Sequence, residues 1–155
     1  MKTLRLVTLA ILATLLAASA GLAQATSDFE LSRDVLRAQR KLLVSQNLTL
    51  SEAEAAAFWP TYDQYAAEQR ALNDRLVKAI EGFAADYDTL TDDRAEELLE
   101  ESLSIREDRN QLRRSYLKRF SKAITGKKLA RFYQIDSKID ALLDAKIAQA
   151  IPLAR

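Results

Sequence analysis

The sequence predicts an all-α fold, and three observations carry that prediction. Beyond residue 25 the chain has two glycines, Gly82 and Gly126, and two prolines, Pro60 and Pro152. Turn-forming residues are this scarce only where a chain makes few turns. Apolar residues recur at steps of three and four, and no run alternates apolar with polar residues. We therefore expect a long antiparallel helical hairpin, bent at Pro60 and flanked by a first and a fourth helix.

The start of the chain has the pattern of a secretory signal peptide over residues 1–25. Lys2 and Arg5 precede an uncharged apolar run that ends in the small-residue sequence AQA. Cleavage after Ala20 instead of Ala25 is an alternative. Retention as a membrane anchor is another, because the run is just long enough to span a bilayer. The pattern predicts export to the periplasm of a Gram-negative bacterium.

Residues 26–155 are enough for a single all-helical domain. Removing Lys2 and Arg5 from the 23 basic side chains leaves 21, against 22 acidic ones, so the net charge of this part is −1. A balanced charge predicts neither nucleic acid nor a membrane as the main partner. The chain has no cysteine, so its stability must come from packing without disulfides.

The first helix is expected over about Asp28–Gln46. Its apolar residues lie broadly on one face at helical spacing: Phe29, Leu31, Val35, Leu36, Leu42 and Leu43. Asn47 follows, and this residue type tolerates the left-handed conformation at a helix end. We expect this helix to dock on the flank of the hairpin.

The second helix is expected to begin at a capping box after Leu50. In such a box the Ser51 side chain accepts from the backbone N–H of Glu54, and the Glu54 side chain accepts from that of Ser51. A stripe at steps of three and four then runs through Phe58, Tyr62, Tyr65, Gln69, Leu72, Leu76, Ile80 (or Ala79), Phe83 and Tyr87. A stripe this long and narrow suits an antiparallel hairpin or a coiled coil.

Four aromatic residues and Pro60 lie together early in this helix. Phe58, Tyr62 and Tyr65 fall on the stripe and are expected in the core. Trp59 lies about 100° round the helix from Phe58, so it needs another partner. Helix one or helix four can supply it, and a contact with a partner protein is the alternative. Pro60 removes one backbone hydrogen bond and should bend the helix.

The third helix is expected to begin at Leu90 and Thr91. Thr91 is a good N-cap, and Asp92 and Asp93 complement the positive end of the helix dipole. Its apolar face consists of Ala95, Leu98, Leu99, Leu103, Ile105, Leu112, Tyr116 and Phe120. About three residues separate it from the second helix, so the two must fold back on each other.

The fourth helix is expected from Thr125-Gly126 to Pro152. Its stripe consists of Leu129, Phe132, Ile135 (or Asp136), Ile139, Leu142, Leu143 and Ile147. Together with the three helices that precede it, this helix gives a four-helix chain.

Side chains for most catalytic chemistry are missing. The chain has no histidine, no cysteine, and no methionine after Met1, which removes most routes to nucleophilic catalysis, proton transfer and soft-metal binding. Asp92, Asp93, Glu96 and Glu97 could hold Ca²⁺ loosely, but carboxylates at a helix start usually complement the dipole. We expect no enzyme activity, no catalytic residue, no cofactor and no metal.

Charge is unevenly distributed along the chain. Residues 81–101 carry nine acidic side chains against one basic, and residues 106–131 carry ten basic against two acidic. One interpretation is a solvated surface whose charges pair across the hairpin. The other is a basic surface that binds unfolded proteins, a sensor domain or, weakly, an anionic membrane surface; nucleic acid is not expected. Under this interpretation four arginines bind the partner: Arg106, Arg109, Arg113 and Arg114.

The two helix starts carry a family resemblance. LSEAE at residues 50–54 and LTDDR at 90–94 resemble the paired LTxxQ motifs of Spy/CpxP-type periplasmic proteins, with Ser for Thr in the first and Glu and Arg where Gln is expected. FWPTY at 58–62 and KLARFYQIDSKID at 128–140 resemble a distantly Spy-like exported group with an FWPxY motif. The resemblance implies a bent hairpin that often dimerises into a cradle. It also implies ATP-independent chaperoning or inhibition of a sensor kinase; the family's metal-sensing role needs ligands that are missing here.

These observations lead to one main functional hypothesis and two alternatives. The main hypothesis is a periplasmic, ATP-independent, chaperone-type protein that acts in the envelope stress response. The alternatives are a regulatory partner of an envelope sensor and a structural envelope protein, while a hydrolase would need a cleft that a thin hairpin lacks. We also expect a homodimer, because long helices with narrow apolar stripes bury a modest core.

Overall fold

A computed structural model describes residues 39–154 of the chain. Three long helices, α2 (Glu52–Asp86), α3 (Asp92–Phe120) and α4 (Gly126–Ala150), follow a helical segment at residues 39–47. No strand occurs within the described residues, which confirms the all-α prediction. The predicted signal peptide and the first part of the predicted first helix lie outside the described residues.

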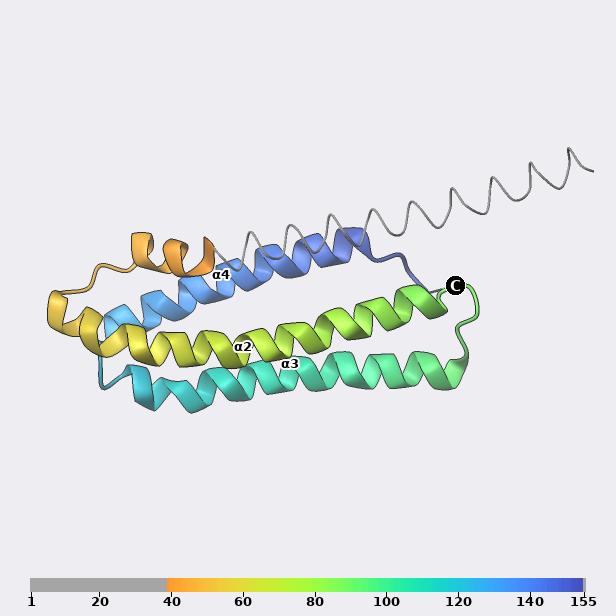
Figure 1. Ribbon diagram of the computed structural model, residues 1–155, viewed down its shortest axis with the longest axis horizontal. Helices are drawn as coiled ribbons and strands as arrows, with labels where there is room; N and C mark the ends of the chain where they lie inside the picture. Colours follow the sequence, from red (N-terminus) through yellow and green to blue (C-terminus); the bar gives the residue numbers. More distant parts are fainter. Residues whose placement is uncertain (1–38, 155) are drawn as a thin grey trace, which may run out of the picture.

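The predicted hairpin is formed by α2 and α3, which lie antiparallel and side by side (Figure 1). The turn between them covers residues 87–91. α4 returns along the hairpin, and the segment 39–47 lies beside the first half of α4, at the end that holds the α3–α4 turn (Figure 1). The hairpin is therefore flanked by α4 and by the described part of the predicted first helix, which lie next to each other.

Both predicted helix caps form. The backbone N–H of Ser51 donates to the Glu54 carboxylate over 2.8 Å, and the N–H of Glu54 donates to Ser51 Oγ over 3.3 Å. Thr91 Oγ1 accepts from the backbone N–H of Arg94 over 3.3 Å. Lys128 Nζ lies 2.5 Å from the Glu54 carboxylate and so joins the first turns of α2 and α4. This hydrogen bond with Lys128, together with that from the Ser51 backbone, holds the pKa of Glu54 below its ordinary value.

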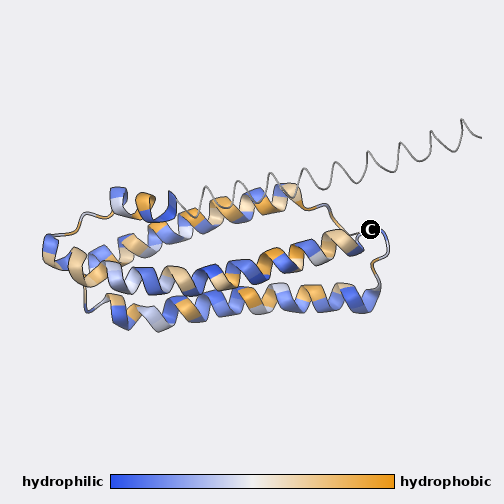
Figure 2. Cartoon of the chain, in the orientation of Figure 1, coloured by the Kyte–Doolittle hydropathy of each residue, from blue (hydrophilic) through white to orange (hydrophobic). Residues whose placement is uncertain are grey.

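The hydrophobic core lies in the half of the molecule that contains the α3–α4 turn. Hydrophobic positions recur along each helix between hydrophilic ones (Figure 2), but they are fully enclosed mainly in this half. In the other half only Val77 and Ile105 are buried among the described hydrophobic residues. The core cluster comprises Val44, Leu48, Phe58, Tyr62, Tyr65, Leu112, Tyr116, Phe120, Ile124, Phe132 and Ile139.

α2 runs through Pro60 as one continuous helix of 35 residues. Figure 1 shows this helix gently curved and unbroken. Pro60 has no N–H to donate to the Ala56 carbonyl, and both residues are exposed. The proline is therefore accommodated on the outer side of the helix.

Candidate protein-interaction site

Trp59, predicted to need a partner from outside the hairpin, has one on the N-terminal segment. Lys41 Nζ lies 5.4 Å from the centre of the indole ring, within the range of a cation–π contact. The ring also meets Phe58 and Tyr62 edge-on, at centroid distances of 5.1 and 5.4 Å. Trp59 is half-buried and packs against the core, which leaves part of the ring open to solvent.

Two of the four predicted partner-binding arginines face α4. Arg109 donates to the Asn73 side chain over 2.6 Å and lies 3.6 Å from the Asp144 carboxylate. Arg113 forms an ion pair with Asp140. The charges of Arg109 and Arg113 are therefore compensated within the molecule.

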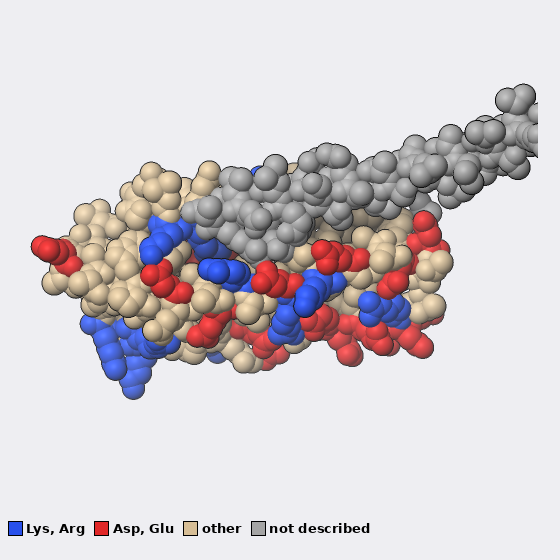
Figure 3. All heavy atoms as spheres, in the orientation of Figure 1, with Lys and Arg blue, Asp and Glu red and all other residues tan. Residues whose placement is uncertain are grey.

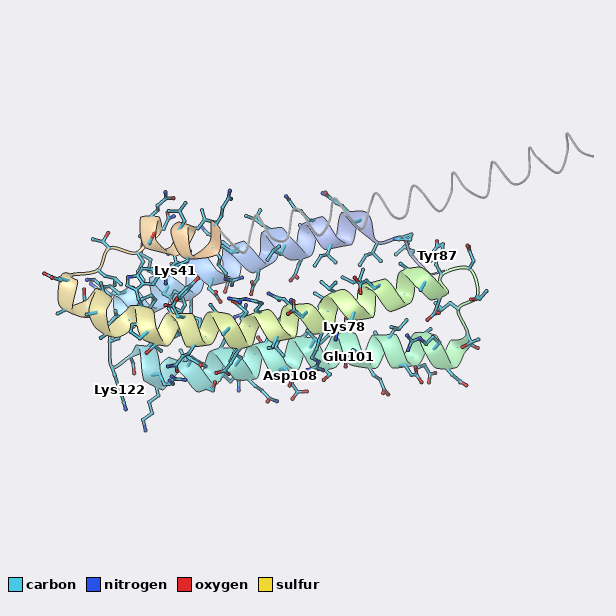
Figure 4. All side chains as sticks on the ribbon, in the orientation of Figure 1. Lys41, Lys78, Tyr87, Glu101, Asp108 and Lys122 are labelled. Atoms are coloured by element: carbon cyan, nitrogen blue, oxygen red, sulfur yellow. The ribbon has the colours of Figure 1, made fainter. Side chains whose placement is uncertain are left out.

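The other two arginines face solvent. Arg106 and Arg114 are exposed, and neither forms an ion pair with a described residue. The structure thus compensates two of the four arginines within the molecule and leaves the other two without an ion pair among the described residues. It also pairs basic and acidic residues across the hairpin elsewhere: Arg75 lies 3.0 Å from Glu101 and 2.6 Å from Asp108, both labelled on α3 in Figure 4.

A buried ionic cluster, which the sequence did not reveal, joins the N-terminal segment to α3 and α4. Asp136 is fully buried, forms an ion pair with Arg40, and accepts a hydrogen bond from Tyr65 Oη over 2.8 Å. Asp140 pairs with Arg40 over 2.8 Å and also with Arg113. Two arginines thus balance two aspartates, as buried charges require. The available signal was Asp136 itself, a charged residue on the apolar stripe of the fourth helix.

Burial and the neighbouring charges raise the pKa values of the tyrosines and of Arg40 around this cluster. Burial raises the pKa of Tyr62 to about 12, and burial together with the charge of Asp136 raises that of Tyr133 to about 12. The same two causes raise the pKa of Tyr65 further. Burial alone would lower the pKa of Arg40, but the attraction of the aspartates outweighs it and raises the pKa. These shifts move the pKa values of the three tyrosines and of Arg40 further from neutral pH.

An open groove of about 500 Å³ lies near the α2–α3 turn, where that half of the hairpin meets the last turns of α4. Its walls are mostly apolar and include Leu76, Ile80, Phe83, Leu98, Ile147 and Ile151. Arg106 and Arg109 also line it. A neighbouring cavity of about 400 Å³ shares Leu76, Arg109 and Ile147 with the groove and extends to Arg40. The apolar stripe of α2 was expected to be buried along its whole length. In this half of the molecule it lines the open groove instead.

Charge is segregated along the long axis. In Figure 3 acidic side chains gather around the end with the α2–α3 turn, and basic side chains project at the opposite end. Lys122, labelled in Figure 4, points away from the helices at that basic end. This arrangement agrees with the predicted acidic tip.

Two further observations concern residues 39–154. No group of three or more His, Cys, Asp or Glu side chains in this range is placed to hold a metal ion. No helix in the range combines the length and the hydrophobicity needed to cross a membrane.

Comparisons with protein families, curated proteins and solved structures found no match.

Proposed function

We propose that this chain is an exported, non-enzymatic protein of the Spy-like type that holds partly unfolded proteins without ATP. The observation that carries the proposal is the apolar groove of about 500 Å³ between the hairpin and α4. A groove with apolar walls accepts apolar side chains that a folded client would bury. The resemblance of the helix starts at Leu50 and Leu90 to the LTxxQ motif supports the same class.

Basic side chains beside the groove suit this role. Arg106 is exposed and lacks an ion-pair partner among the described residues, so it can attract acidic segments of a client at long range. Such attraction between exposed charges is screened by salt. We therefore assign apolar contact to the groove walls and a salt-dependent increase in association rate to the arginine.

The test measures aggregation of a reduced or heat-stressed client at low ionic strength, with the chain in several-fold molar excess. Ala148→Glu and Ile151→Glu each place a charge in the groove, and both should weaken the suppression of aggregation. Ala141→Glu introduces the same charge at an exposed position of α4 that does not line the groove, and it should leave suppression unchanged.

Two outcomes would count against the proposal. Failure of the unmodified chain to suppress aggregation would refute protein holding itself. Equal suppression by the groove variants and by Ala141→Glu would show that the groove is not the site. A third result would affect only one part of the proposal. If suppression does not change with salt, Arg106 does not contribute by electrostatic attraction, and the role of the groove still stands.

A further inference from the structure

The cavity of about 400 Å³ beside the groove is polar at one end and apolar at the other. Its wall on α2 begins with the polar side chains of Tyr62, Gln69 and Asn73. The wall becomes apolar at Leu76, where the groove begins, and the groove also shares Ile147 with the cavity. The cavity and the groove therefore form one trough, with its polar end near the aromatic core and its apolar end toward the α2–α3 turn.

Two buried polar side chains at the polar end of the trough lack a hydrogen-bond partner. Gln69 is 4% exposed and Tyr62 is 2% exposed, and both line the cavity. Neither the Gln69 amide nor the Tyr62 hydroxyl forms a hydrogen bond with a described side chain. Buried polar groups in folded proteins are nearly always hydrogen-bonded. A ligand that brings acceptor oxygens into the cavity would satisfy both donors.

The polar end also carries one positive charge that the fold does not neutralise. Three of the four basic side chains that line the cavity, Arg40, Lys41 and Arg109, lie within ion-pair distance of aspartates. The fourth, Arg70, is exposed and forms no ion pair with a described residue. One uncompensated cation matches a ligand with a single negative charge. A phosphate monoester carries nearly two negative charges at neutral pH, more than this end of the trough balances.

The length of the trough indicates the size of the ligand. From Gln69 to Phe83 it follows α2 for 14 residues, which is about 21 Å at 1.5 Å per residue. An acyl chain in one leaflet of a membrane spans about 15 Å, half of the hydrocarbon thickness. A single acyl chain therefore fits along the trough, with its head group near Gln69 and Arg70 and its methyl end toward Phe83.

We infer that this trough binds a fatty acid, a single acyl chain with a carboxylate head group. The carboxylate accepts hydrogen bonds from the Tyr62 hydroxyl, the Gln69 amide and the Arg70 guanidinium, and the chain packs against Leu76 and Ile147. Arginine suits this head group because its planar guanidinium can donate two parallel hydrogen bonds to a carboxylate. The inference goes beyond client holding and does not depend on it, since Tyr62, Gln69 and Arg70 lie outside the groove.

Binding can be measured with cis-parinaric acid, a fatty acid whose fluorescence rises in apolar surroundings. Titration of the unmodified chain should show saturable binding, weaker for the methyl ester of the same fatty acid, which has no charge. Arg70→Gln removes the positive charge at an exposed position. It should weaken binding of the acid by about tenfold or more, because it removes a hydrogen bond between charged groups. Binding of the ester should stay unchanged in this variant.

Two comparisons separate this site from general effects of charge and from client holding. Arg114→Gln changes an exposed arginine of α3 that forms no ion pair with a described residue and lines neither the cavity nor the groove. This variant should bind the acid normally. Arg70→Gln should also suppress client aggregation normally, because Arg70 does not line the groove, so the two proposals can fail separately.

Ile147→Glu tests the apolar part of the trough, since Ile147 lines both the cavity and the groove. A charge there should weaken binding of the acid and of the ester alike, whereas Ala141→Glu, at an exposed position of α4 outside both, should change neither. Normal binding of the acid by Ile147→Glu would overturn the inference.

Three further results would overturn it. The first is binding of cis-parinaric acid that does not saturate, and the second is equal binding of the acid and its ester by the unmodified chain. The third is an equal effect of Arg70→Gln and Arg114→Gln on binding of the acid. Displacement of the probe by dodecyl phosphate at lower concentration than by dodecanoate would overturn the assignment of a carboxylate head group.

Discussion

Asp136 shows how a single residue can determine where an element docks. Its carboxylate is fully buried and lies between Arg40 of the N-terminal segment and Arg113 of α3. Removing one member of such a cluster leaves the opposite charge buried without compensation, which usually costs more than the pair itself contributes. Asp136 is therefore expected to be among the residues most sensitive to substitution.

Asp136→Ala should lower the free energy of unfolding by about 3–5 kcal/mol, because Asp140 alone cannot balance both arginines. Urea denaturation followed by circular dichroism measures this loss. Asp63→Ala is the matched control: it breaks an exposed ion pair, 2.6 Å from Lys41, and should cost at most about 1 kcal/mol. Equal losses for the two variants would show that the buried cluster does not stabilise the fold.

Two tyrosines, the buried Tyr62 and the half-buried Tyr133, predict how stability changes at alkaline pH. An unfolded tyrosine ionises near pH 10, whereas the pKa values of Tyr62 and Tyr133 in the fold are raised to about 12. Because the folded pKa is the higher one, the stabilisation by the neutral phenols is complete below pH 10. It is lost as the pH rises toward 12.

Tyrosinate absorbance and urea unfolding between pH 9 and 12 measure this effect. For the buried Tyr62 the loss should be of the order of 2–3 kcal/mol, at about 1.4 kcal/mol per pKa unit. Tyr62→Phe should remove that part of the pH dependence and retain the core packing. Ionisation of all tyrosines near pH 10 in a chain that stays folded would contradict the burial of their hydroxyl groups.

At the scale of elements, the helix starts could be predicted because the interactions that define them are local. The capping box joins residues three positions apart, Ser51 and Glu54, and the Thr91 cap reaches Arg94. The spacing of Phe58, Tyr62 and Tyr65 likewise identified the buried face of α2. The pairing of Arg40 with Asp136 spans 96 positions and depends on how helices dock, which helical periodicity does not encode.

The first turn of α4 is less well adapted than those of α2 and α3. Thr125 makes no side-chain capping hydrogen bond, and no acidic residue lies in the first turn. Gly126, the first helical residue, has no positive φ, and a Cβ added there would meet nothing within 4 Å. A glycine at this position costs conformational entropy without providing a conformation that other residues cannot adopt.

Gly126→Ala should therefore raise the free energy of unfolding by about 0.4–1 kcal/mol. Thermal and urea unfolding measure the gain. Gly82→Ala is the comparison within α2, since its Cβ would lie 3.0 Å from the guanidinium of Arg94. That guanidinium is paired with Asp86 over 2.9 Å, and moving it should cancel part of the gain. A loss of stability in Gly126→Ala would contradict the open surroundings of this position.

At the scale of the whole molecule, the two halves differ in how completely they are packed. Around the α3–α4 turn, aromatic rings from three helices meet, with Phe58 and Phe120 5.2 Å apart and Phe120 and Phe132 4.8 Å apart. Toward the α2–α3 turn, the apolar residues of the hairpin line an open groove. Sparse apolar burial permits local opening below the free energy of global unfolding, so an open apolar groove is compatible with a stable core in the other half.

Native-state hydrogen exchange should reveal this gradient along α2 and α3. We expect backbone amides in residues 58–69 and 112–120 to exchange only through global unfolding, because the core cluster packs around them. Amides in residues 78–86 and 94–103 should exchange through local opening, at a lower free energy and with little dependence on denaturant. Mass spectrometry of peptides from the two halves, over a series of urea concentrations, measures both values. Equal protection in the two halves would show that the hairpin opens as one unit and that the groove has no separate mobility.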